Sequence, residues 1–177
     1  MATTKWIMDA AHSEVQFKVR HMVVSNVTGS FGKFNAEVES EGDDITTAKV
    51  HFTADIDSIS TNNEQRDNHL KSADFFDGAT HPQLTFDSTK IEHISGSDYK
   101  MHGNMSIRGT VKPIVLTVEF GGIVNDPWGN IRAGFTVEGK LNRKDFGLAW
   151  SAVTEAGHLV VGDEVRLHAN AEFTKQA

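Results

Sequence analysis

The sequence contains no cysteine and no apolar run long enough for a membrane-spanning helix. Without cysteine, the chain has no disulfide framework, no thiolate metal ligand and no cysteine nucleophile. Its apolar runs all stay well below the roughly 20 residues that a transmembrane helix requires. Basic residues are also few, 17 against 24 acidic ones, so the net charge is −7. Because nucleic-acid-binding surfaces are basic, we expect no nucleic-acid partner.

Signals for targeting and for metal binding are absent as well. The first 17 residues lack the basic-then-apolar layout of a signal peptide. We therefore expect a cytoplasmic protein, or a periplasmic one if the chain is a trimmed mature form. The nine histidines include no H-E-x-x-H pair and no other tight ligand cluster. We accordingly predict no metal site and no required cofactor.

Most of the chain alternates between apolar and polar residues with a period of two, which is typical of β-strands with one buried face. Alternating segments, separated by turn residues, occur at residues 13–21, 32–40, 48–59, 83–91, 99–120, 130–141 and 164–173. They predict about eight strands.

Helix signals are few. Thr61 stands three residues ahead of Glu64, as in a capping box, and predicts a short helix over residues 62–71. Residues 21–29 are compatible with a half-turn of helix or with a bend. Because so little helix cannot cover both faces of an open sheet, we predict one closed sheet. Residues 1–177 are thus expected to form a single all-β domain, an eight-stranded antiparallel barrel with one or two short helices.

The predicted inner face of this barrel has many small residues. Gly103 and Gly109 fall on the same side of their segment as Met101 and Met105. Two explanations are open: small residues vacate space for a ligand cavity, or they mark corners and bulges where strands bend. Eleven phenylalanines stand against one tyrosine. Such a surface suits contact with hydrocarbon, although an ordinary phenylalanine-rich core has the same composition.

Seven ordered blocks of the sequence resemble the YceI-like family of polyisoprenoid-binding proteins. In chain order they are WIMDAAHSEVQFKVRH, VSNVTGSF, RDNHLKSADFF, HPQLTFDS, MSIRGTVKPI, NRKDFGL and VGDEVRL. The resemblance covers nearly the whole chain. It implies a lipocalin-like barrel of eight antiparallel strands around an elongated apolar pore. It also implies a polyprenyl chain, as a prenyl phosphate or an isoprenoid quinone, held inside that pore.

The resemblance and the inner register together suggest site residues. The residues expected to contact the lipid tail are Phe17, Val19, Phe34, Phe52, Phe86, Met101, Met105, Leu116, Phe135, Val137 and Phe146. Gly103 and Gly109 are expected to form the cavity. The head group is expected at one mouth of the barrel, near His21, Arg66, Asp67, His69, Arg143 and Lys144. Arginine can fork onto a phosphate, whereas a quinone needs only one or two neutral donors.

Three functional classes remain open at this point. The first, which we favour, is a protein that carries or sequesters an isoprenoid lipid. The second is a lyase or hydrolase acting on a small apolar substrate, but the inner register supplies almost no converging titratable residues, so we do not expect an enzyme. The third is a structural module with a filled core and no ligand. The resemblance is also compatible with transient membrane contact and with a homodimer, although no pattern indicates an interface.

Overall fold

The computed structural model describes residues 3–21, 25–148 and 161–176, and β-strands dominate this part of the chain. The strands are β1 Thr3–Met8, β2 Glu14–His21, β3 Ser25–Phe31, β4 Phe34–Glu41, β5 Asp44–Asp55, β6 Ile59–Ser60, β7 Gln83–Ser95, β8 Asp98–Ile107, β9 Thr110–Asn125, β10 Ile131–Asn142 and β11 Val161–Lys175. The one described α-helix is α1, Glu64–Lys71. Three short 3-10 helices are η1 Ala10–His12, η2 Ile56–Ser58 and η3 Arg143–Phe146.

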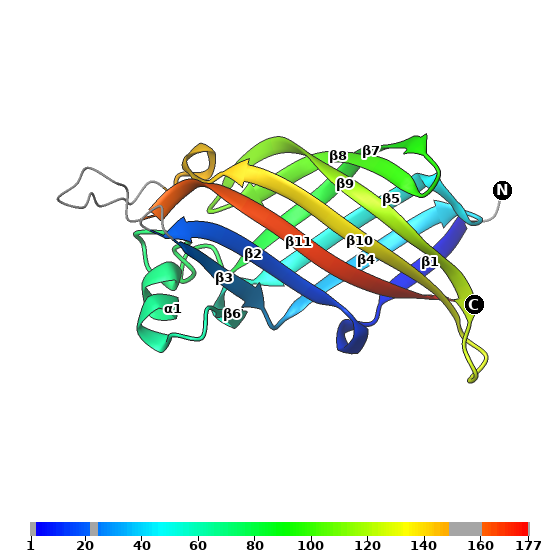
Figure 1. Cartoon of the computed structure of the whole chain (residues 1–177), viewed down its shortest axis with the longest axis horizontal. Coiled ribbons are helices and arrows are strands. Elements are labelled where there is room, and N and C mark those ends of the chain that lie inside the picture. The colour runs from blue at the N-terminus through cyan, green and yellow to red at the C-terminus, as the bar shows by residue number, and fades with distance from the viewer. Residues whose placement is uncertain (1–2, 22–24, 149–160, 177) are drawn as a thin grey trace.

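Eight of these strands form a closed antiparallel ring in the order β1-β4-β5-β7-β8-β9-β10-β11, and β11 pairs with β1 to complete it. Strand β11 is long enough to pair with two strands along the same edge. It pairs with β2 from Val161 to Asn170 and with β1 from Phe173 to Lys175. The result is the elongated barrel of Figure 1. The predicted eight-stranded antiparallel barrel with a short helix is confirmed.

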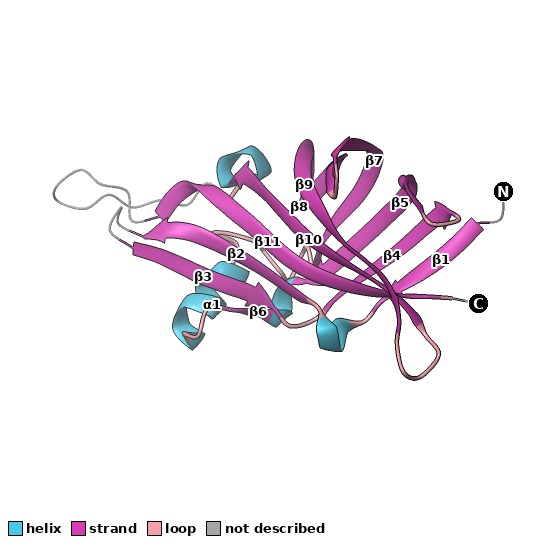
Figure 2. Cartoon of the chain, turned by 45° about the vertical axis from the view of Figure 1, so that its right-hand side comes forward, coloured by secondary structure: helices cyan, strands magenta, loops and turns pink. Residues whose placement is uncertain are grey.

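The two ends of the barrel differ. At one end β2 continues the wall through β3 and the short β6, and α1 lies beside them (Figures 1 and 2). η3 lies at this end as well, whereas the two chain termini lie at the opposite end (Figure 1). The first end is therefore built from irregular segments and the second from strand ends and tight turns.

The segment 99–120, expected as one continuous stretch of alternation, is in fact a hairpin. Strand β8 ends at Ile107 and β9 begins at Thr110, and these two residues are paired. Between them Arg108 and Gly109 both have positive φ, 52° and 76°. A two-residue turn with this backbone matches the twist of antiparallel strands. Directly paired residues face the same side of a sheet, so Ile107 and Thr110 share a face and the inward register changes from odd to even residue numbers across the turn. Leu116 is accordingly buried, whereas Val111 is 58% exposed.

Two further differences concern residues 21–29, of which 22–24 lie outside the described residues, and α1. Residues Ser25–Phe31 form strand β3, paired with β2, rather than a helical turn or a bend. The helix begins at Glu64, and its N-cap is Asn63, whose side chain accepts from the Arg66 amide. Thr61 was expected as the cap; it contacts Asp67 instead, through its amide and its hydroxyl.

Candidate functional site

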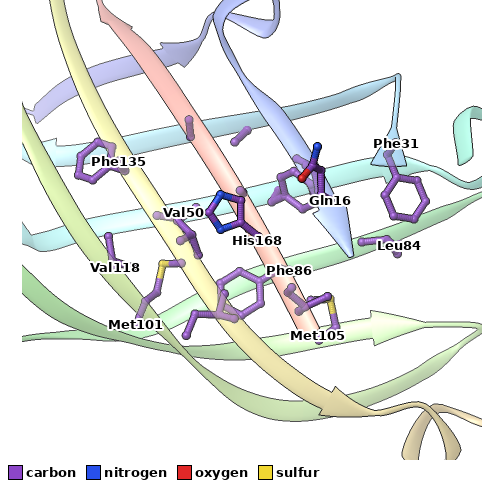
Figure 3. Close-up of a pocket in the computed structure, with 18 of the residues that line it drawn as sticks. Gln16, Phe31, Val50, Leu84, Phe86, Met101, Met105, Val118, Phe135 and His168 are labelled. Carbon is purple, nitrogen blue, oxygen red and sulfur yellow. The ribbon is translucent and has the colours of Figure 1, made fainter. Parts of the chain in front are cut away.

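A cavity of about 260 Å³ runs through the inside of the barrel. All eight strands of the closed ring contribute side chains to its wall. It extends from Trp6, at the end where the chain termini lie, to Arg143 and Leu148 at the end that bears α1. Figure 3 shows part of the wall, where Phe86, Met101 and other apolar side chains from separate strands surround one space.

The wall is almost wholly hydrocarbon because alternate residues of each strand face inward. Aromatic rings line much of it and contact one another. The Phe120 and Phe135 rings are stacked with centroids 5.2 Å apart, and Phe173 meets Phe135 edge-on at 5.8 Å. Towards the α1 end, the Phe17 and Phe31 ring centroids are 5.7 Å apart. None of these rings has a polar atom that would require a partner.

Most of the residues predicted to contact a lipid tail lie on this wall. Nine of the eleven do so, namely Phe17, Val19, Phe52, Phe86, Met101, Met105, Leu116, Phe135 and Val137. Phe146 does not, because η3 buries its ring in the core, where it is 1% exposed. Phe34 packs against the same core and is only partly buried, but it does not line the cavity. Contact of the nine with a ligand stays a prediction.

The two glycines predicted to form the cavity have other roles. Gly109 lies in the β8–β9 turn rather than on the inner face, so its prediction was wrong. Its positive φ explains the residue, since side chains rarely adopt that conformation. Gly103 does lie in β8, but the Phe86 ring covers it: an added Cβ would lie within 3.0 Å of that ring.

Arg143 is the charged residue of the wall at the α1 end. Its guanidinium donates to the carbonyls of Leu148 at 2.5 Å, Gly162 at 2.9 Å and Val161 at 3.3 Å. It also lies 3.5 Å from an Asp163 carboxylate oxygen, and its side chain is 3% exposed. Burial lowers the pKa of Arg143, and the Asp163 charge opposes that shift. The arginine thus ties η3 to the start of β11 while adding positive charge at this mouth.

The other predicted head-group residues do not line the cavity. Lys144 is half-exposed and pairs with Asp163 at 3.4 Å. Arg66 donates to the hydroxyl and the carbonyl of Thr61, and Asp67 accepts from the same residue. These contacts hold the start of α1 in place.

His69 pairs with Asp74 at 2.9 Å and meets the Phe75 ring edge-on. The backbone of His21 ends β2, but its side chain lies outside the described residues. Leu70, Phe75 and Phe76, from the same segment as His69, line the cavity instead. The apolar residues of the segment HLKSADFF were the available signal for them.

Polar contacts lie at the opposite end of the cavity. Trp6 lies on the wall, and its Nε1 donates to the Ser40 hydroxyl at 3.1 Å. The Lys175 ammonium lies 5.8 Å from the centre of the Trp6 ring and 3.3 Å from an Asp43 oxygen. Asp43 is the charged wall residue at this end. The charged wall residue is thus an arginine at the α1 end, where Arg143 and Lys144 share Asp163, and a carboxylate paired with Lys175 at this end.

A second polar cluster lies on the outer surface, where β1 turns into β2. Arg132 contacts Asp9, Asp126 and Glu172 at 2.8, 2.7 and 3.4 Å. Hydrogen bonds from His12 and Arg132 lower the pKa of Asp9 to about 2, and the bond from Arg132 does the same for Asp126. Asp9, His12 and Glu172 lie close enough to hold a metal ion, but the Arg132 guanidinium already pairs with both carboxylates. This cluster joins strands and is not part of the cavity.

Within the described ranges, the only helix of two turns is α1, and no helix is long and apolar enough to cross a membrane.

Comparisons with known proteins place the whole chain in one group. A family model described as the YceI-like domain matches residues 6–173. A UPF0312 protein of Staphylococcus aureus strain N315 is 36% identical over 172 residues, covering 97% of this chain and 98% of that protein.

Solved structures show the same barrel. A YceI protein of Campylobacter jejuni is 34% identical with a TM-score of 0.77, covering 87% of this chain and 88% of its own. BcnA of Burkholderia cenocepacia gives a TM-score of 0.81 at 22% identity, over 93% and 98% of the two chains. A polyisoprenoid-binding domain from Saccharophagus degradans gives 0.68 at 15% identity, over 97% and 98%. The last two likenesses concern the fold alone.

Proposed function

The chain belongs to the family of YceI-like domains, and from this premise we propose that it binds a long-chain polyisoprenoid lipid inside its barrel. The observation that supports this most directly is the continuous apolar cavity, whose wall includes side chains from all eight strands of the ring. One structural neighbour is described as a polyisoprenoid-binding domain. In our proposal the protein carries or sequesters the lipid and does not transform it.

The energetics favour a long chain over a short one. Each buried CH₂ contributes about 0.8 kcal/mol, so a five-carbon isoprene unit contributes roughly 4 kcal/mol. Micromolar affinity requires about 8 kcal/mol beyond an association cost of about 4–15 kcal/mol, so roughly three to six units suffice. The 15 residues of β11, tilted as barrel strands are, span roughly 38 Å along the axis. The barrel thus has the length for a chain of that size.

We place the head group at the Arg143 mouth and the tail towards Trp6. Arg143 and Lys144 supply positive charge at that mouth, whereas the charged wall residue at the far end is Asp43. Arg143 and Lys144 share the single carboxylate of Asp163, which leaves one positive charge at that mouth. Asp43, by contrast, is paired with Lys175. An anionic head group is therefore attracted to the first end more than to the second. This charge difference favours a prenyl phosphate over a neutral quinone.

A lyase or hydrolase is less well supported by the wall. Catalysis by general acid and base needs titratable groups that converge on one point of the cavity. Among the described wall residues, Arg143 and Asp43 lie at opposite ends. His168 also contributes atoms to the wall. Its ring, however, pairs with the Glu138 side chain, which is 63% exposed and lies on the outer surface. No acid–base pair within the described part of the wall therefore faces the cavity.

Native mass spectrometry of the protein purified from its own organism, followed by organic extraction, tests the proposal. We expect a prenyl phosphate or prenyl quinone at close to one molecule per chain. Ala169→Phe, which adds a ring on the cavity wall, should reduce that occupancy. Arg166→Phe, on the exposed face of the same strand, is the matched control and should leave it unchanged. A wild-type protein that yields no lipid and takes up no added prenyl phosphate would contradict the proposal.

A further inference from the structure

Three large side chains of the cavity wall lie directly against a glycine of the neighbouring strand. Phe17 of β2 covers Gly29 of β3, Phe86 of β7 covers Gly103 of β8, and Leu116 of β9 covers Gly139 of β10. A Cβ atom added at any of these glycines would lie less than 3.0 Å from the covering side chain. Real Cβ atoms essentially never show so short a contact. We call each such arrangement a glycine niche.

The backbone does not explain why these positions are glycine. None of the three has a positive φ, unlike the turn glycines such as Gly109. Glycine also weakens a strand, since it adds backbone entropy and no packing surface. The remaining reason is space: the missing side chain leaves room for a neighbour to lie flat along the sheet. Phe17 is paired directly opposite Gly29, which puts its ring over the glycine.

From this we infer that the glycine niches set the width of the cavity, and that Gly29 and Gly139 determine which hydrocarbon chains it admits. Phe17, Phe86 and Leu116 all line the cavity. A side chain seated in its niche lies against the wall, whereas one expelled from it projects into the space that a ligand needs. A methyl-branched chain is broader than a straight one, so it is excluded first as the cavity narrows. The ligand class in this inference rests on the proposed function.

The niches differ in how cleanly they can be tested. At Gly103 an added Cβ would also lie near the Asp87 carbonyl oxygen, at 2.5 Å, so alanine there strains the backbone. At Gly29 the three nearest atoms all belong to the tip of the Phe17 ring, and at Gly139 the nearest atom is a terminal methyl of Leu116. These flexible ends can move. Gly134 in β10 is the matched control, because a Cβ there meets nothing within 4 Å.

The test compares two probes with the same head group, geranylgeranyl phosphate and the straight-chain octadecyl phosphate, by isothermal titration calorimetry on the full chain. Overpacking a site by one displaced side chain weakens binding by roughly tenfold. We expect Gly29→Ala and Gly139→Ala to lose about that much affinity for the branched probe and clearly less for the straight one. Gly134→Ala should match the wild type. Phe17→Leu added to Gly29→Ala should restore binding of the branched probe, because leucine does not reach the niche.

An unchanged ratio of the two affinities in both glycine variants would overturn the inference, and so would failure of the Phe17→Leu rescue. Xenon binding can be measured from the NMR shifts of the Val15 and Val19 methyl groups. This measurement distinguishes a failure of this inference from a failure of the proposed function. Apolar cavities take up xenon without any lipid. If the wild type binds neither phosphate but Gly29→Ala lowers xenon uptake relative to Gly134→Ala, the proposed function fails and the niches still set the width. Equal xenon uptake would refute the role of the niches. If Gly29→Ala does not fold, Gly139→Ala and the Phe17→Leu rescue variant decide by the same criteria.

Discussion

Replacing Arg143 by methionine is the sharpest test of how the cavity mouth is held together. Methionine keeps most of the hydrocarbon of the arginine stem but donates no hydrogen bonds. The change removes the donors to Leu148, Gly162 and Val161, of which the bond to Leu148 is fully buried. Each acceptor left without a partner costs about 1–3 kcal/mol when buried, and less where water can reach it.

The net effect is smaller than the sum of three lost bonds. A buried guanidinium has itself been removed from water, and methionine does not incur that penalty. Asp163 is one-third exposed, so water can solvate its carboxylate once the arginine is gone. We therefore expect Arg143→Met to lower the free energy of unfolding by about 2–4 kcal/mol. For a chain of this size, Tm should fall by roughly 5–15 °C.

Urea unfolding of Arg143→Met beside Lys144→Met measures this effect. Both side chains contact Asp163, but Lys144 is 45% exposed, so its removal should change stability by less than about 0.5 kcal/mol. Hydrogen exchange should accelerate in residues 143–148 and 161–165 of the arginine variant alone. Equal stability of the two variants would show that the hydrogen bonds of Arg143 do not hold η3 to β11.

Two further predictions concern the core and the outer surface. Phe146→Ala should lower the free energy of unfolding by about 3–5 kcal/mol, because the Phe146 ring is 1% exposed. The folded variant should still bind lipid at the wild-type stoichiometry, since Phe146 does not line the cavity. A folded variant that no longer binds lipid would contradict this prediction. Asp9 and Asp126 have pKa values lowered to about 2 from 3.8 by Arg132 and its neighbours, so their stabilising contribution is complete above pH 3.8 and declines as the pH falls towards 2. The stability difference between the wild type and Arg132→Met, measured by urea unfolding over this range, should shrink as the pH falls, and a difference that does not depend on pH would refute the pairing.

The inner face of the barrel could be predicted residue by residue from the alternation. Met101, Met105, Phe135 and Val137 were assigned to that face from the period of two alone, and all four line the cavity. This succeeds because the side-chain period of a strand is fixed by covalent geometry, so one buried residue places its neighbours. Phe146 was misassigned because it follows the end of β10, in η3, where the period no longer applies.

The residues at the mouth could not be predicted, because charge in a sequence does not reveal its partner. Arg66 and Asp67 were candidates for a ligand head group, but both are engaged with Thr61, a few residues away. Arg143 contacts carbonyls 5 to 19 residues away, and no local pattern indicates which segment it meets. Strand β3 was missed for a similar reason, since its pairing with β2 depends on a partner strand and not on its own composition.

The sequence by itself determined that the chain forms one closed antiparallel barrel and which face of most strands is apolar, because both follow from the local period of hydrophobic residues. Only the tertiary structure decided how that interior is used. Whether a glycine on the inner face leaves a hole or receives a neighbouring ring depends on the register of the next strand, which places Phe17 over Gly29 and Leu116 beside Gly139. Register is a relation between distant segments, and the same composition with strands shifted against one another would enclose a different space.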